Sequence, residues 1–277
     1  MACRVFQSSI RATALFLFIA GQCLLAQLPG LEKEPWTGYF AVYQQRTFHY
    51  MIDSKGEGTI APLQRTGAPI TKVLHLPVTV FIQEKMPDGK VVEHEGLAVS
   101  LKSTSEPTEK LTKLTYTGKT KEETAFEVSV ESQGDRLRYG GRITDKGKLT
   151  ANPIRLCVQV KFPSAYRPAD RDEKEVIKQI RDDELKVTRS DGKRFRLVAD
   201  KPLAEPPNEV ADKDLGLVSV EIGAWRGMNF EFSAMPNSAL RLTTPETEGL
   251  LRGFFVQWTP DPATDPKGES RFQIEMK

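Results

Sequence analysis

Residues 126–131, with the sequence FEVSVE, decide the fold class because apolar and polar side chains alternate strictly along them. Successive side chains of a β-strand point to opposite faces, so a period of two places Phe126, Val128 and Val130 on one face. The pattern predicts a strand that is buried on that face and exposed to solvent on the other.

The same alternation recurs on both sides of this stretch. It is found at Leu97, Val99 and Leu101; Leu137, Tyr139 and Ile143; Leu156, Val158, Val160 and Phe162; Val218, Val220 and Ile222; Phe230 and Phe232; Phe254, Val256 and Trp258; and Phe272, Ile274 and Met276. Turn residues separate the first runs at 54–57, 87–90 and 145–148, where a glycine permits the positive φ of tight hairpins. The sequence therefore predicts a mainly β protein, built of antiparallel β-sandwich or barrel-like units.

The segment 167–186 breaks this rhythm. Asp170 precedes Glu173 by three residues, which resembles a capping box at a helix N-terminus. A narrow apolar stripe follows, made of Val176, Ile177 and Ile180. We expect one connecting α-helix over about 171–184; the alternative, a charged helix that binds a partner, is disfavoured by the thin apolar face.

The length of 277 residues fits one large domain or two ordinary ones. The pattern suggests an N-terminal β unit over 30–165, a helical connector over 166–184 and a C-terminal β unit over 185–277. The second run of strands could equally complete a single sandwich with the first, so both domain counts stay open.

Residues 1–26 have the layout of a secretory signal peptide: Arg4 and Arg11, an apolar core over 12–20, and small residues before an expected cleavage near Ala26. The apolar core is shorter than the roughly 20 residues of a membrane helix. We therefore expect a secreted or periplasmic protein with no membrane span once the signal is removed. A lipid anchor at Cys23 is the weaker alternative, because a glutamine precedes it where a small residue is needed.

Charge and cysteine content further limit the functional classes and the cellular compartment that fit this sequence. Apart from Arg4 and Arg11, the chain carries 37 basic and 37 acidic residues, without the basic excess of a nucleic-acid binder. Cleavage would remove Cys3 and Cys23 and leave only Cys157, so no internal disulfide is expected. Together with the absence of an Asn-x-Ser/Thr site, this favours a bacterial envelope.

No catalytic or metal-binding motif stands out. The three histidines are isolated from one another in sequence, and neither a Gly-x-Ser-x-Gly elbow nor a phosphate-binding loop is present. We predict no catalytic residue, no metal ligand and no cofactor. Among the many acids no catalytic pair stands out, and Glu93 and Glu95 only share a strand face. Asp261, Asp265 and Glu269 of loop 260–269 could gather calcium, but the EF-hand spacing is absent and surface acids of a proline-stiffened loop are the alternative.

Aromatic residues carry the only functional signal. Seven aromatic or histidine side chains crowd into residues 36–50. Candidate ligand-binding residues are Trp36, Tyr39, Tyr43, Trp225 and Trp258. Alternation would place Tyr39 and Tyr43 on one side of a strand, where exposed rings could stack on sugars or anchor a protein. A buried aromatic cluster is the alternative.

The sequence thus suggests an exported, non-catalytic β-rich binding or structural module of the cell envelope or exterior. Carbohydrate and an envelope protein are the expected partners, and nucleic acid is not. The alternatives are a carbohydrate-active enzyme or carbohydrate-binding protein that uses exposed aromatics and scattered carboxylates, and a protein-binding subunit of an envelope assembly.

Overall fold

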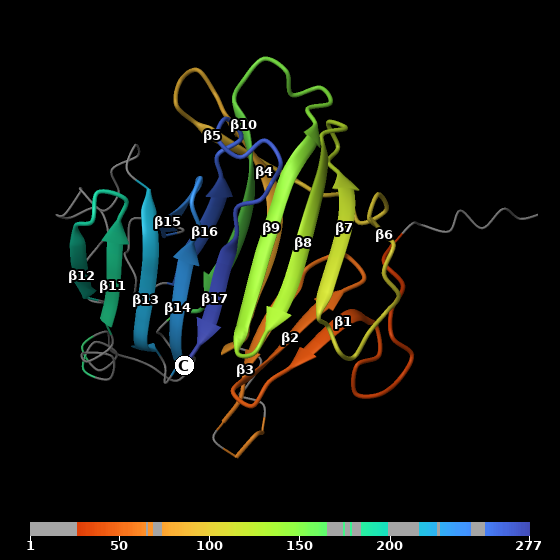
Figure 1. Ribbon diagram of the computed structural model, residues 1–277, viewed down its shortest axis with the longest axis vertical. Helices are drawn as coiled ribbons and strands as arrows, with labels where there is room; N and C mark the ends of the chain where they lie inside the picture. Colours follow the sequence, from red (N-terminus) through yellow and green to blue (C-terminus); the bar gives the residue numbers. More distant parts are fainter. Residues whose placement is uncertain are drawn as a thin grey trace, which may run out of the picture.

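The computed structural model describes residues 27–64, 66–68, 74–164, 184–198, 216–225, 228–244 and 253–277, together with Lys174 and Lys178. Its strands form one continuous 17-stranded sheet in which neighbouring strands pair antiparallel. The predicted mainly antiparallel β fold is confirmed (Figure 1).

The first ten strands cover the N-terminal part of the chain. They are β1 (Tyr39–Gln44), β2 (Phe48–Asp53), β3 (Gly58–Pro62), β4 (Leu76–Lys85), β5 (Val91–Glu95), β6 (Lys102–Ser103), β7 (Lys113–Lys119), β8 (Ala125–Gln133), β9 (Arg136–Asp145) and β10 (Ile154–Phe162). Gly56, Gly89 and Gly147 adopt positive φ angles of 78°, 84° and 54°, as expected for the turns predicted around them.

The C-terminal part adds seven strands. They are β11 (Glu184–Arg189), β12 (Arg194–Val198), β13 (Leu217–Trp225), β14 (Met228–Ala234), β15 (Ser238–Thr243), β16 (Phe254–Pro260) and β17 (Phe272–Met276). Strand β10 joins the two parts, because it pairs with β4 along one edge and with β16 along the other. The sheet is therefore continuous across the boundary between the two predicted units.

The sheet folds over on itself into two layers. The first layer runs β12-β11-β13-β14-β17-β9-β8-β7, and its strands β8 and β9 lie in front of β4 in Figure 1. The second layer contains β4, β10, β16 and β15, with β3 and β5 both pairing with β4. One buried apolar cluster lies between the layers and includes Val128, Val158, Phe232 and Trp258.

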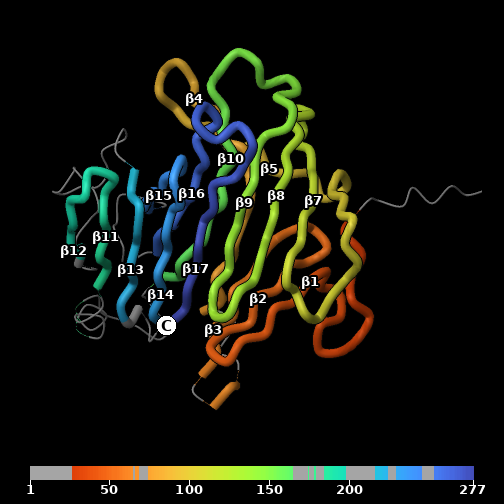
Figure 2. The backbone as a smooth tube through the Cα atoms, in the orientation of Figure 1, coloured from red at the N-terminus to blue at the C-terminus, as the bar shows by residue number. Residues whose placement is uncertain are grey.

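Three loops that matter below gather at one end of the molecule. In Figure 2 the β4–β5 turn, the β9–β10 loop and the β16–β17 loop all lie at the top. Residues of the β9–β10 and β16–β17 loops line a common hollow, which confirms that they are neighbours.

Two predictions lie outside the described residues. They are the signal peptide over 1–26 and the helix over about 171–184, of which only Lys174, Lys178 and Glu184 are described, the last as the start of β11. In the part of the chain that the structure describes, no helix is long and apolar enough to span a bilayer.

Candidate functional site

The candidate site is built on the side of the second layer that faces away from the core. In β4, Val78 and Ile82 are buried in the core, so Thr79, Phe81 and Gln83 point to the opposite side. The same alternation puts Cys157 and Gln159 of β10, and Gln257 of β16, on that side. The outward side of the second layer therefore carries polar side chains in the middle of the sheet as well as at its margins.

Strand register aligns these side chains in rows. Thr79, Gln159, Gln257 and Arg241 stand opposite one another across β4, β10, β16 and β15. A second row joins Glu93, Gln83 and Arg155, and a third joins Glu95, Phe81 and Cys157, both across β5, β4 and β10. We call this set the polar sheet face: Thr79, Phe81, Gln83, Glu93, Glu95, Arg155, Cys157, Gln159, Arg241 and Gln257.

Two glutamines of the polar sheet face are buried even though they point away from the core. Gln83 is 7% exposed and Gln257 is 8% exposed. Gln257 donates a hydrogen bond from Nε2 to Oε1 of Gln159 at 2.7 Å, which fixes the orientation of both amides. Each amide has an acceptor oxygen and two N–H donors, so this pair retains donors and an acceptor for a ligand.

An acidic hollow of about 210 Å³ opens at one edge of this face. Strand β3 pairs with Leu76–Val78 and β5 pairs with Phe81–Lys85, which leaves Thr79 and Val80 without a strand partner on that edge of β4. The lining includes the carboxylates of Glu57, Glu93 and Glu95 and the rings of Phe81, Tyr116 and Phe126. Carboxylates and aromatic rings therefore meet in one cavity.

The spacing of the two strand carboxylates follows from backbone geometry. Glu93 and Glu95 are two residues apart on β5, so their Cα atoms lie about 6.6 Å apart with both side chains on the same face. Carboxyl groups of inverting glycosidases are roughly 6.5–9.5 Å apart. Glu93 and Glu95 thus project two carboxylates from the same face of β5 into the acidic hollow, where they could accept hydrogen bonds from hydroxyl groups.

A second, basic hollow of about 540 Å³ lies at the other end of the polar sheet face. Lys85, Arg155 and Arg241 line it from β4, β10 and β15, together with Asp261 from the loop after β16. The polar sheet face therefore runs from an acidic edge at β5 to a basic end at β10 and β15.

Cys157 lies between the two hollows and is fully buried. Burial raises the pKa of the thiol; the nearby Glu93 carboxylate raises it further, and Arg155 and Arg241 act in the opposite direction. The thiol remains protonated at neutral pH.

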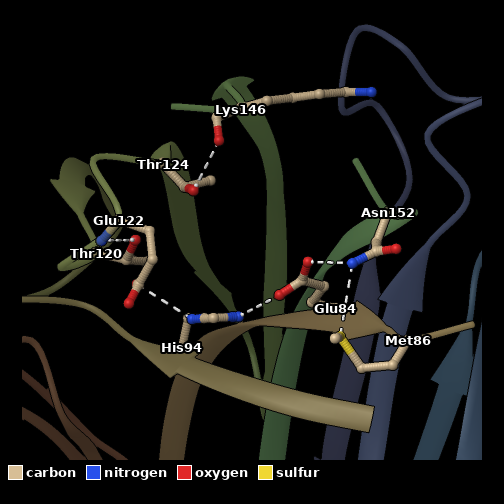
Figure 3. Close-up of polar contacts among 8 residues, drawn as sticks. All are labelled: Glu84, Met86, His94, Thr120, Glu122, Thr124, Lys146 and Asn152. Carbon is tan, nitrogen blue, oxygen red and sulfur yellow. Dashed lines mark hydrogen bonds and ion pairs between the residues drawn. The ribbon is translucent and has the colours of Figure 1, made fainter. Parts of the chain in front are cut away.

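A second polar cluster, the His94 clamp, lies at the end of the core-facing side of β4 (Figure 3). His94 contacts Oε2 of Glu84 through Nε2 at 3.0 Å and Oε2 of Glu122 through Nδ1 at 3.1 Å. Asn152 donates from Nδ2 to the other oxygen of Glu84 at 2.7 Å. The clamp joins β4, β5, the β7–β8 turn and the β9–β10 loop.

The His94 clamp holds its carboxylates ionised. Hydrogen bonds from Asn152 and then His94 lower the pKa of Glu84. Burial acts to raise the pKa of Glu122, but hydrogen bonds from its own backbone, Thr120 and His94 and the charge of His94 lower it overall. Both contacts of His94 are hydrogen bonds to carboxylates only when both ring nitrogens carry protons.

The sequence did not predict the His94 clamp, because the three histidines are isolated from one another in sequence. A signal existed, because the turn at 87–90 fixes a hairpin register in which Glu84 pairs with Val92, and His94 lies two residues after Val92 on the same strand face. Glu122 and Asn152 could not be added to it without the tertiary fold.

Metal binding finds no support in the described residues, where no group of three or more His, Cys, Asp or Glu side chains is arranged to hold an ion. In the loop that could have gathered calcium, Asp265 accepts hydrogen bonds from the backbone of Glu269 and Ser270 at 2.7 and 2.8 Å. Asp261 accepts one from the backbone of Ala263 at 2.9 Å. These carboxylates stabilise their own turns.

The predicted aromatic site residues do not form one surface. Trp36 and Tyr39 are half-buried and pack with Val42 in a small cluster, whereas Tyr43 packs against the main core. A β-bulge between Tyr39 and Ala41 shifts the alternation by one residue, so the prediction that Tyr39 and Tyr43 share a side is wrong.

The two other predicted tryptophans are equally separate. Trp258 is fully buried and stacks on Phe272, with ring centroids 6.1 Å apart and planes inclined by 8°. It offers no surface to a ligand. Trp225 ends β13, and its side chain lies outside what the structure describes. The polar sheet face was not predicted as a site, although Glu93 and Glu95 were noted as a pair.

No protein-family profile matches the sequence, and no curated protein matches it. Several solved structures are similar to this chain, and three of them are described here. A protein proposed to be an aldose 1-epimerase, from Escherichia coli K12, has a TM-score of 0.45 and 10% identity over 86% of this chain and 98% of its own. A galactose mutarotase related enzyme from Lactobacillus acidophilus has a TM-score of 0.40 and 11% identity, over 85% and 96%.

The third is the Slr1438 protein from Synechocystis sp. PCC 6803, with a TM-score of 0.41 and 13% identity over 85% of this chain and 97% of its own. These scores and identities assign the chain to no family and give it no activity.

Proposed function

We propose that this protein binds carbohydrate on the polar sheet face. The observation that carries the proposal is the row of Thr79, Gln159, Gln257 and Arg241, which stand in register on four strands and point away from the core. Strands hold side chains more rigidly than loops do, so this row presents its polar groups in a fixed arrangement.

The residue types suit a ligand rich in hydroxyl groups. Each sugar hydroxyl both donates and accepts hydrogen bonds, and planar amides, carboxylates and guanidinium groups can meet two neighbouring hydroxyls at once. The Gln159–Gln257 pair has one amide edge fixed by its internal hydrogen bond of 2.7 Å. Little conformational entropy would therefore be lost when the remaining amide atoms bind a sugar.

The acidic hollow adds carboxylates next to the polar groups. Glu93 and Glu95 line it beside Phe81, Tyr116 and Phe126, which are only 2–4% exposed. Sugar hydroxyls can donate hydrogen bonds to carboxylate oxygens. The hollow therefore supports a sugar unit that directs its hydroxyls to the carboxylates.

Binding without catalysis is the primary proposal, and a carbohydrate-active enzyme is the second candidate. The second rests on one observation, that Glu93 and Glu95 lie on the same face of β5 and both line the acidic hollow. Release of reducing sugar from an oligosaccharide, abolished by both Glu93→Gln and Glu95→Gln, would establish the second candidate.

The place of action is part of the proposal. The signal-peptide layout of residues 1–26 supports export to the periplasm or exterior, where polysaccharides of the envelope are accessible. An envelope protein as the partner is the competing possibility. It would be favoured by capture of a specific envelope protein whose binding is lost when an exposed apolar residue such as Leu97 is replaced.

Isothermal titration calorimetry of the full chain with neutral mono- and oligosaccharides measures the binding affinity and tests the proposal. Gln159→Ala is expected to weaken binding at least tenfold, because it removes one amide and releases the other. Lys113→Ala, on the outer side of the first layer and paired only with Glu131, serves as the matched control. Equal affinities for wild type and Gln159→Ala would contradict the proposal.

A further inference from the structure

We propose that the basic hollow holds the anionic group of an acidic saccharide, so that the ligand is a sugar bearing a carboxylate, sulfate ester or phosphate ester. The inference rests on the proposed function and specifies its ligand class. It places the uncharged hydroxyls on the polar sheet face and the oxyanion beside Arg155 and Arg241.

Three cationic side chains converge on this hollow from three strands. Lys85 lies at the end of β4, Arg155 near the start of β10 and Arg241 in the middle of β15, and all three line the cavity of about 540 Å³. A cavity of this size accommodates a small ligand. Convergence from separate strands concentrates positive charge in a concave region, where it attracts anions most strongly.

Some cations elsewhere on the two layers pair with a carboxylate or lie close to one. Arg136 pairs with Glu275 at 3.0 Å, and Arg142 lies 3.4 Å from Glu127. Among the described residues, no carboxylate pairs with the half-buried Arg155 guanidinium. A guanidinium that is neither paired nor fully exposed is suited to an oxyanion, which it can bind through two parallel hydrogen bonds.

Asp261 is the one acid among the described residues that line the basic hollow. Its carboxylate accepts hydrogen bonds on Oδ1 from the backbone of Ala263 at 2.9 Å and on Oδ2 from the hydroxyl of Thr264 at 3.0 Å, so it is held in its own turn. Its single negative charge offsets one of the three cations, and the formal charge of the lining residues stays positive.

The layout of the polar sheet face orients such a ligand. Glu93, Gln83 and Arg155 stand in one row across three neighbouring strands, so the backbones of Glu93 and Arg155 lie about 9.6 Å apart. Glu93 and Glu95 repel an anion at one end, and Arg155 attracts it at the other. A single charged group on the sugar therefore selects one orientation of the ligand.

The test compares an acidic saccharide with a neutral counterpart of the same size. Isothermal titration of the full chain would use trigalacturonate and its methyl ester, with glucose 6-sulfate and glucose 6-phosphate against glucose to identify which oxyanion is preferred. We expect the charged form of at least one pair to bind about tenfold or more tightly than the neutral form, the effect of one charge-assisted hydrogen bond.

Substitutions then test whether Arg155 is the residue that makes the protein prefer the charged saccharide. Arg155→Gln should abolish the preference for the charged form by lowering the affinity for that form about tenfold more than the affinity for the neutral form, whereas Arg155→Lys should retain part of the preference. Arg142→Gln, on the outer side of the first layer, is the control and should change neither affinity. The wild-type comparison needs no variant, so it stands even if one variant fails to fold.

The outcomes separate the two proposals. Binding of the neutral form with no advantage for any charged form overturns this inference and leaves the carbohydrate proposal intact. Equal loss of both affinities in Arg155→Gln also overturns it. Binding of the charged forms that Gln159→Ala does not weaken would show simple anion binding, and no binding of any saccharide would overturn both proposals.

Discussion

The burial of Trp258 leads to an unusual prediction for two substitutions at the same site. The indole is fully buried and stacked on Phe272, yet its Nε1–H has no hydrogen-bond partner among the described residues. A buried unpaired donor costs about 1–3 kcal/mol. Trp258 therefore stabilises the core by its area and destabilises it by its N–H group.

The magnitudes follow from these two effects. Trp258→Ala removes the whole side chain and should lower the free energy of unfolding by about 3–5 kcal/mol. Trp258→Phe retains a ring against Phe272 and gives up roughly 40 Å² of burial, worth about 1 kcal/mol at ~25 cal/mol per Å². Because it also removes the unpaired N–H, we expect its free energy of unfolding to stay within about 1 kcal/mol of wild type.

Urea unfolding followed by circular dichroism measures both values, with m-values compared to establish that the denatured states are equivalent. Each variant that folds should bind saccharide with wild-type affinity, since Trp258 lies on the core side of β16. The reasoning is refuted if Trp258→Ala costs less than about 1 kcal/mol, or if Trp258→Phe costs as much as Trp258→Ala.

Three further predictions concern the His94 clamp, the acidic hollow and the thiol. The pKa values of Glu84 and Glu122 are lowered from an ordinary 4.5 in the folded state, so both carboxylates stabilise the fold above pH 4.5. This stabilisation is lost as the pH falls through the lowered pKa values. The melting temperature should therefore drop between pH 7 and 3, and an unchanged melting temperature would contradict the prediction. In Gly96→Ala the new Cβ would lie 2.8 Å from Cζ of Phe126, so urea unfolding should show a loss of about 1–3 kcal/mol and titration a weaker affinity for sugar. Cys157 should resist a thiol reagent such as dithionitrobenzoate in the native protein and react at once in urea, and fast native labelling would refute its burial.

Local sequence patterns were sufficient to predict the strands and much of the buried core. The alternation of Phe126, Val128 and Val130 predicted a half-buried strand, and all three side chains are buried in β8. The same reasoning placed Leu156, Val158 and Val160 on one face of a strand, and all three are buried in β10. These predictions succeed because the side-chain period of a strand is a local property of the backbone.

The candidate site depends on distant pairing, which the sequence alone does not reveal. Gln159 meets Gln257 only because β10 pairs with β16, nearly one hundred residues further along the chain. The side of Tyr39 was predicted incorrectly because one bulged residue reverses the alternation that follows it. Register and bulges are decided by the whole sheet, so the grouping of site residues could not be read from local periodicity.

The most direct test of the central claim is a nuclear magnetic resonance titration of the glutamine side-chain amides with saccharide. Binding on the polar sheet face predicts that the amide signals of Gln83, Gln159 and Gln257 shift together and saturably. Gln273 is the internal control, because it lies on β17 in the other layer and accepts a hydrogen bond from Arg138 at 3.2 Å. Saturable binding that leaves the three amides unchanged, or that shifts Gln273 equally, would contradict the claim.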